Sequence, residues 1–400
     1  MIEDKKLYLF EQAPVPRAVM SMSVPTVISS LVMVIYNLAD TYFVGMLGDP
    51  IQNAAVTLSA PILLAFNAIN NLFGIGTSSL MSRALGKKEY DEVRRASAFG
   101  FYCTVFCSFL FSVIYLTVKS PLLVLLGTDA DTVAATAEYM KWTVALGAMP
   151  AILNVVMAYM VRSEGSTAHA SIGTMSGCIL NIILDPIFIL PQGLGMGAAG
   201  AGLATFLSNC AACLYFFCLL FIKRKRTYVC INLRMFRLKK EIIAEVCKVG
   251  IPAAIQNLLN VVGMTVLNNF TSSFGANAVA AMGIAQKIDM VPMNVAFGFS
   301  QGIMPLISYN YASGDRKRMK ETVVFAGKVT VFVLAAVASC FFAASGFWME
   351  LFIRNESIVA YGASFLKGLC IALPFLGMDF LAVGVFQAVG MGEKAFFFAI

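Results

Sequence analysis

The sequence predicts an all-α integral membrane protein in which two similar halves surround a central cleft. Of its 400 residues, 59% are hydrophobic and 13% are charged, and the mean hydropathy is +0.80. Soluble domains carry about a quarter charged residues. Apolar stretches long enough for a membrane-spanning helix of about 20 residues recur along the whole chain. A weak internal repeat indicates that these helices form two like sets.

Ten complete membrane spans are expected, and an eleventh begins near the last residues of the sequence. We place the complete spans at 18–44, 53–80, 96–118, 138–160, 170–190, 199–221, 249–271, 279–305, 324–346 and 360–386. A polar segment separates the sixth span from the seventh. The expected domains are an amino-terminal lobe (1–222) of six helices, a basic cytoplasmic linker (223–248), and a carboxy-terminal lobe (249–400) with four complete helices and the start of a fifth.

Matched prolines and glycines relate the two halves. The pairs are Pro25 and Pro252, Gly48 and Gly275, Gly74 and Gly302, and Gly86 and Gly314. Six helices in the first half would start both halves on the same side of the membrane, so the halves are parallel repeats, an arrangement found in transporters. A complete second half would end at roughly residue 450 by the same offset. We therefore expect a truncated chain with an incomplete second lobe.

Basic residues predict the topology. All but five of the 29 Lys and Arg residues fall in the amino-terminal segment and in alternate loops, which places that side in the cytoplasm. The exceptions are Lys119, Lys141, Lys287, Arg354 and Lys367. Because the basic residues are divided among short loops at one membrane face, they do not form a surface for nucleic acid, and no such partner is expected.

The sequence carries no pattern typical of catalysis. The stretch from Gly195 to Gly200 matches a dinucleotide-binding motif, but it lies between two apolar spans with no strand before it. The single histidine, His169, has no cysteine or carboxylate nearby to complete a zinc site. Cys210 and Cys213 lie within a span and are interpreted as packing residues. We expect no enzyme activity, no cofactor and no resident metal other than a coupling ion.

Four acidic residues lie inside the predicted spans, where an ionised carboxylate costs several kcal/mol unless it has a partner, water or a proton. They are Asp40, Asp185, Asp289 and Asp379. In the first span, Asp40 shares a helix face with Tyr36 and Asn37, which lie one turn earlier. This face is therefore a polar stripe on an otherwise apolar helix.

Asp185 occupies a similar setting in the fifth span, four residues after Asn181 and on the same face. Pro186 follows and leaves one helical carbonyl without its donor, which predicts a kinked, polar helix end. Because the first and fifth spans run in the same direction, Asp40 and Asp185 lie at similar depth and could share a cavity. Two adjacent carboxylates favour retention of a proton, which suits proton coupling. The alternative is that each is a surface residue near a span end.

The second half offers fewer ionisable candidates and more amides. Three amides lie close together in the seventh span: Gln256, Asn257 and Asn260. Asp289 is two residues from Lys287 in the eighth span and does not face it, so either a structural pair with another helix or a binding site is expected. Asp379 in the tenth span is a candidate second cation-binding position, and Met290 could line a soft, adaptable ligand cavity.

Several segments resemble the signature motifs of multidrug and toxic compound extrusion (MATE) transporters, in particular the prokaryotic DinF-like, MepA-like branch. They are Tyr36–Gly45, Arg162–Gly165, Asn181–Phe188, Gly250–Pro252 and Gln301–Pro305. The resemblance extends over essentially all 400 residues. It implies two lobes of six helices, a central cleft, and export of organic cations driven by protons or sodium.

The resemblance also implies roles for individual residues. Asp40, Asp185 and Asn181 match ion-coupling positions of that branch, for H+ or alternatively Na+, and Thr205 matches a threonine of the sixth helix. The candidates for the substrate cavity are Tyr36, Asn37, Tyr139, Asn154, Gln256, Asn257, Asn260, Asp289, Met290 and Asp379. Asn260 stands where other branches carry an acidic residue, so their sodium site is not expected here.

Taken with the residues, the resemblance predicts an H+- or Na+-coupled antiporter for amphipathic, mainly cationic compounds. Its expected partners are small organic cations and membrane lipids, and it would act as a monomer in the inner (cell) membrane of a prokaryote. The alternative is a lipid-linked oligosaccharide flippase of the same superfamily. Such a flippase would need an arginine-lined cavity for pyrophosphate, whereas the predicted spans contain no arginine and only a few lysines, Lys287 among them.

Overall fold

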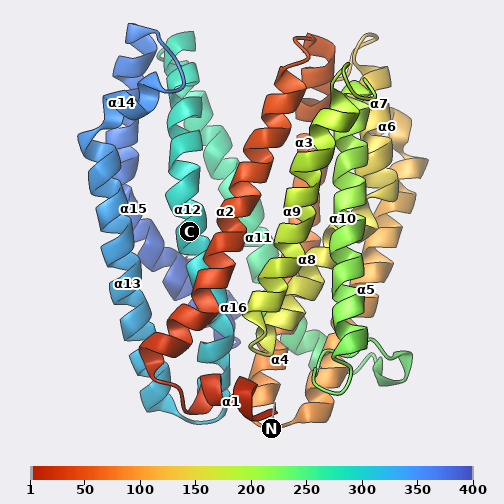
Figure 1. Ribbon diagram of the computed structural model, residues 1–400, viewed down its shortest axis with the longest axis vertical. Coiled ribbons are helices and arrows are strands. Elements are labelled where there is room, and N and C mark those ends of the chain that lie inside the picture. The colour runs from red at the N-terminus through yellow and green to blue at the C-terminus, as the bar shows by residue number, and fades with distance from the viewer. Residues whose placement is uncertain (1–2, 399–400) are drawn as a thin grey trace.

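The computed structural model describes residues 3–398, and no β-strand occurs among them (Figure 1). The first half contains α1 (Glu3–Glu11), α2 (Val15–Gly45), α3 (Pro50–Ile69), η1 (Asn70–Ile75), α4 (Gly76–Gly86), α5 (Tyr90–Thr117), α6 (Lys119–Leu125), α7 (Val133–Met140), η2 (Lys141–Leu146), α8 (Ala148–Ser163), α9 (Thr167–Ile189) and α10 (Gly197–Ile222). A connecting segment with one short 3₁₀ turn, η3 (Leu233–Met235), leads to the second half. That half contains α11 (Lys240–Ser272), α12 (Ala276–Ala312), α13 (Arg316–Ala343), α14 (Ser345–Glu350), α15 (Glu356–Ala388) and α16 (Gly392–Phe398).

The ten predicted spans correspond to ten helical segments. Nine helices among the described residues are long and apolar enough to cross a membrane, and one bent pair supplies a tenth. In that pair, Val133–Leu146 and Ala148–Ser163 meet at 47° and together form the predicted fourth span. The π-helical turns η1 and η2 interrupt the second and fourth spans. Such turns often occur at functional sites, and no periodicity in the sequence pointed to them.

Helix lengths reproduce the internal repeat. The helices α5 and α13 each contain 28 residues, and a short helix, α6 or α14, follows each of them. The helices that open the two halves, α2 and α11, contain 31 and 33 residues and carry the matched prolines Pro25 and Pro252. The two halves therefore share one helix order, as expected for parallel repeats.

The halves approach each other most closely where α2 of the first half packs along α12 of the second, while its other side packs on α9 (Figure 1). Two glycines of α12 permit this approach. A methyl group at Gly302 would lie 2.6 Å from the Ser23 Cα atom, and one at Gly298 would lie 3.1 Å from the Val27 Cα atom. Small residues allow helix backbones to pack this closely inside a membrane.

The N-terminal helix α1 joins the two halves at one end of the molecule (Figure 1). Phe10 is fully buried and stacks on Tyr309 of α12 at 4.7 Å, while its other side packs on Gly165 of the first half. The Tyr309 hydroxyl donates to Glu11 at 2.6 Å. Arg318 of α13 donates from Nε to the Phe10 carbonyl at 2.6 Å. Contacts from both halves therefore hold this helix.

A second group of contacts joins the halves at the same end. The Arg83 guanidinium of α4 pairs with the Glu245 carboxylate of α11 at 2.7 Å, and the arginine side chain is largely shielded from solvent. The Ser79 hydroxyl donates to the Gln387 carbonyl of α15 at 2.6 Å. These contacts join the halves directly at this end of the molecule.

Candidate functional site

An acidic cluster lies inside the first half, and its centre is Asp185 on α9. Asp185 is 0% exposed and Asn181, one turn earlier on the same helix, is 1% exposed. In the amide orientation that satisfies both ends, Asn181 donates to Asp185 Oδ2 at 2.9 Å and accepts from the Thr205 backbone N–H at 3.1 Å. The predicted grouping of Asp185, Asn181 and Thr205 is therefore present as one hydrogen-bonded set.

Asp40 of α2 reaches the same cluster. Its carboxylate lies close enough to the Asp185 carboxylate, and to the Tyr36 and Tyr139 hydroxyls, for its charge to influence them. The Tyr36 hydroxyl lies near the Thr205 side chain. One oxygen of Asp40, Oδ1, is buried without a hydrogen-bond partner in the described structure. A buried anionic oxygen of this kind is costly unless a proton or a cation satisfies it.

Two other first-half candidates lie outside this cluster. The Asn37 side chain is exposed on α2. Asn154 is buried between α8 and α10, where its amide donates to the Asn209 side chain at 3.0 Å and to the Pro150 and Ala151 carbonyls of its own helix. Asn154 therefore satisfies its donors within the first half.

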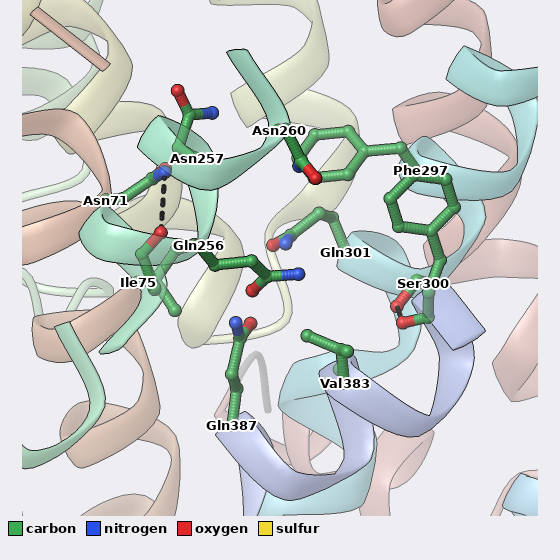
Figure 2. Close-up of a pocket in the computed structure, with 13 residues that line it drawn as sticks. Asn71, Ile75, Gln256, Asn257, Asn260, Phe297, Ser300, Gln301, Val383 and Gln387 are labelled. Carbon is green, nitrogen blue, oxygen red and sulfur yellow. Dashed lines mark hydrogen bonds between the residues drawn. The ribbon is translucent and has the colours of Figure 1, made fainter. Parts of the chain in front are cut away.

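A second, separate site lies between the halves (Figure 2). It is a cavity of about 80 Å³ to which η1, α11, α12 and α15 all contribute. The lining residues are Asn71, Ile75, Ala253, Gln256, Asn257, Asn260, Phe297, Ser300, Gln301, Phe380, Val383, Gly384 and Gln387. No charged residue is among them. The wall is thus neutral, rich in amides and bordered by two phenylalanines.

Amide groups converge on this cavity from different helices. Figure 2 shows Gln256 of α11, Gln301 of α12 and Gln387 of α15 pointing toward one another. Gln301 Oε1 is buried without a hydrogen-bond partner in the described structure. The Asn71 amide donates to the Ala253 carbonyl at 3.3 Å, which ties η1 to α11 across the boundary between the halves.

The predicted amides Gln256, Asn257 and Asn260 all line this cavity, whereas Asp289, Met290 and Asp379 do not. Asp289 is buried within the second half. Sequence reasoning missed Asn71, Gln301 and Gln387. Their signal was present as amides in apolar spans, but uncharged side chains do not stand out there as carboxylates do.

With this geometry established, comparison with known proteins places the chain. The MatE family model matches residues 25–187 and 252–400. The chain belongs to the MatE family. Its two-lobed helical fold and its predicted resemblance to MATE transporters are confirmed, and it is a multi-pass membrane protein.

Relatives of this MatE chain match it from end to end. The multidrug export protein MepA of Staphylococcus aureus (strain MRSA252) is 32% identical over 401 residues, covering 100% of this chain and 87% of MepA. MepA of Staphylococcus saprophyticus is 33% identical over 399 residues with the same coverage. Among solved structures, a multidrug resistance MATE family transporter in an outward-facing conformation superposes with a TM-score of 0.93 at 28% identity, covering 99% of this chain and 87% of that one.

Proposed function

We propose that this MatE-family chain is a multidrug exporter that expels amphipathic, mainly cationic compounds in exchange for H+ or Na+. The observation that carries the proposal is the pairing of two distinct sites. A buried carboxylate cluster lies within one half, and a neutral cavity lies between the halves. An antiporter needs one place for the coupling ion and another for the substrate. The names of the MepA relatives, which are multidrug export proteins, support the same proposal.

Asp40 and Asp185 are proposed to hold the coupling ion. Two neighbouring carboxylates inside an apolar lobe repel each other when both are ionised, and a proton or a sodium ion relieves that repulsion. Asn181 and Thr205 hold Asp185 in place. One charge moved across ~100 mV supplies about 2.3 kcal/mol. At about 1.4 kcal/mol per tenfold, one ion therefore supports a substrate gradient of roughly fiftyfold.

The cavity between the halves is proposed to hold the substrate. Phe297 and Phe380 offer aromatic faces to a cation, and the amides of Gln256, Gln301 and Gln387 offer acceptor oxygens. In the described conformation the cavity measures about 80 Å³. Drug-sized ligands occupy pockets of roughly 300–1,000 Å³, so the halves must separate before a substrate enters. The absence of a lining arginine, among the described residues, argues against the pyrophosphate-carrying flippase.

Alternating access follows from where the halves are joined. Contacts of α1, Arg83 and Glu245 hold the halves together at the end that carries the N-terminus, and the basic residues favour a cytoplasmic position for that end. The chain would therefore be closed toward the cytoplasm in this conformation. Both proposed sites lie within one chain, which supports a monomer as the working unit.

Reconstituted transport tests the proposal. The purified protein is placed in liposomes, and movement of a cationic fluorescent dye is followed under separately imposed pH and sodium gradients. Wild-type protein should move dye against its gradient with one of the two ions. The variants Asp40→Asn and Asp185→Asn should lose gradient-driven transport by at least tenfold, because an amide cannot exchange a proton and binds Na+ more weakly than a carboxylate.

The matched control is Asp91→Asn, which removes an exposed carboxylate from the first turn of α5 and should transport normally. Thermal denaturation of each variant separates loss of folding from loss of coupling. Wild-type dye transport by both Asp40→Asn and Asp185→Asn would refute the coupling role of the cluster.

A further inference from the structure

Residues 223–239 join the two halves. This joining segment packs against the first half at the end of the molecule that carries the N-terminus (Figure 1). The buried Glu164 carboxylate accepts from the Thr227 hydroxyl at 2.9 Å and from the Tyr228 backbone N–H at 2.8 Å. Tyr228 in turn stacks on Tyr90 of α5, with ring centroids 5.0 Å apart. The carboxylate thereby fixes the first part of the segment.

Two residues of α5 fix the next part. The Ser97 hydroxyl accepts from the Cys230 backbone N–H at 3.0 Å, and the Tyr102 hydroxyl donates to the Ile231 carbonyl at 2.8 Å. With its backbone bonded to buried side chains at several positions, the segment has a defined shape. A surface built partly from it is therefore preorganised for binding, which reduces the entropic cost of capturing a ligand.

This defined segment borders an open cavity of about 930 Å³ together with the last turns of α10 and the start of α5. Its lining residues are Arg94, Phe217, Cys218, Leu220, Phe221, Ile222, Arg224, Thr227, Val229, Cys230, Ile231, Asn232 and Met235. The volume is at the upper end of the range for small-molecule sites. Phe221 is 80% exposed, and it lies in the last turn of a membrane-spanning helix. The cavity is therefore apolar on the side that faces the lipid.

Positively charged side chains also line the cavity. Arg94 of α5 and Arg224 of the joining segment both line it. Neither guanidinium makes a hydrogen bond or an ion pair with the described part of the chain, and no carboxylate is among the described lining residues. Guanidinium groups bind phosphate oxygens through paired, charge-assisted hydrogen bonds. Two unneutralised arginines beside an apolar wall fit a ligand with an anionic head and a hydrocarbon tail.

The position of the cavity indicates where such a ligand comes from. It lies at the ends of membrane-spanning helices, beside a run of basic residues. The ends of spanning helices lie near the lipid headgroups. Basic pockets between spanning helices at this level recognise anionic lipid headgroups. We propose that this cavity binds an anionic phospholipid of the adjacent leaflet, with its phosphate between Arg94 and Arg224 and an acyl chain along Phe217 and Phe221.

Lipid titration of the purified protein in a neutral detergent tests the site. Binding of phosphatidylglycerol and of phosphatidylcholine is measured by native mass spectrometry. Each basic side chain near a membrane surface contributes about 1 kcal/mol toward anionic lipid. The pair should therefore give phosphatidylglycerol about thirtyfold tighter binding than phosphatidylcholine, since 1.4 kcal/mol corresponds to tenfold.

Variants locate the site. R94Q/R224Q should lose the preference for phosphatidylglycerol and keep the weak binding of phosphatidylcholine, whereas R94K/R224K should retain part of the preference. The matched control R234Q/R237Q removes two exposed charges of the same segment that do not line the cavity, and should behave as wild type. An unchanged preference in R94Q/R224Q overturns the proposal, and so does equal loss in R234Q/R237Q.

Cysteine labelling supplies an independent readout. Cys218 lines the cavity and is exposed, and Cys340 of α13 is also exposed but lies in the other half. Phosphatidylglycerol should slow the reaction of Cys218 with N-ethylmaleimide at least fivefold and leave Cys340 unchanged. Equal protection of Cys340 would mean a general lipid coat and would overturn the site. Equal protection of Cys218 by inorganic phosphate would identify a site for a free anion and overturn the lipid assignment.

Discussion

Replacing Arg318 with alanine should release the N-terminal helix α1 from the second half. The Arg318 side chain crosses from α13 to the end of α1, where it donates to two carbonyls of the helix and to the Ala13 carbonyl just after it. The distances are 2.6 Å from Nε to the Phe10 oxygen, and 2.6 Å and 3.1 Å from one terminal nitrogen to the Ala13 and Leu9 oxygens. The Leu9 and Phe10 carbonyls lie at the C-terminus of α1, where a positive charge is favourable.

The magnitude follows from these bonds. Hydrogen bonds to a charged group contribute about 1.5–3 kcal/mol each, and bonds that share one side chain do not add fully. The two short bonds together should hold α1 in place by about 3 kcal/mol. Because 1.4 kcal/mol corresponds to tenfold, local opening of α1 should become roughly a hundredfold more frequent in Arg318→Ala.

Hydrogen–deuterium exchange read by mass spectrometry measures this opening directly. Peptides that cover residues 3–13 should exchange roughly a hundredfold faster in Arg318→Ala, while peptides from α9 should be unchanged. Arg316→Ala is the matched control, since Arg316 begins the same helix but stacks on Tyr311 at 4.1 Å rather than on α1. Wild-type exchange of residues 3–13 in Arg318→Ala, or equally fast exchange in Arg316→Ala, would refute the assigned role.

Three further changes test other contacts. Gly302→Ala should lower the free energy of unfolding by about 1–3 kcal/mol, seen as a lower thermal midpoint, because the added methyl group would press on Ser23. Gly283 has open space around it, so Gly283→Ala should be close to neutral, and equal effects of the two changes would contradict the close packing of α2 on α12. Arg83→Gln and Glu245→Gln should each destabilise the protein. A double-mutant cycle of unfolding free energies should give a coupling energy of about 1 kcal/mol, because the ion pair is only partly shielded from solvent, and a coupling of zero would show that the pair contributes nothing. Glu164→Gln should loosen the joining segment, so that trypsin cleaves within residues 224–226 about tenfold faster. The control Glu241→Gln changes an exposed residue of α11 and should be cleaved at the wild-type rate, and an unchanged rate in Glu164→Gln would show that the carboxylate does not anchor the segment.

The sequence by itself determined the membrane spans and the two-lobed plan. A bilayer provides no partners for backbone N–H and C=O groups, so every apolar stretch of sufficient length must be a helix. For the same reason carboxylates are rare within spans, and Asp40 and Asp185 could be recognised as candidates from their position alone. Helical periodicity also placed Asn181 on the face of Asp185, a contact that the structure contains.

Only the tertiary structure decided which helix faces which. Periodicity identifies the residues that share a face of one helix, but it carries no information about the helix that covers that face. The sequence therefore did not predict that Gln301, Gln387 and Asn71 line the cavity, or that Asp289 is buried inside the second half instead. The position of α1 across both halves likewise depends on side chains that are distant in sequence, such as Arg318 and Phe10. The position of the joining segment depends in the same way on Glu164. Contacts of this kind arise when the packed helices bring those groups within hydrogen-bond distance, which no local pattern records.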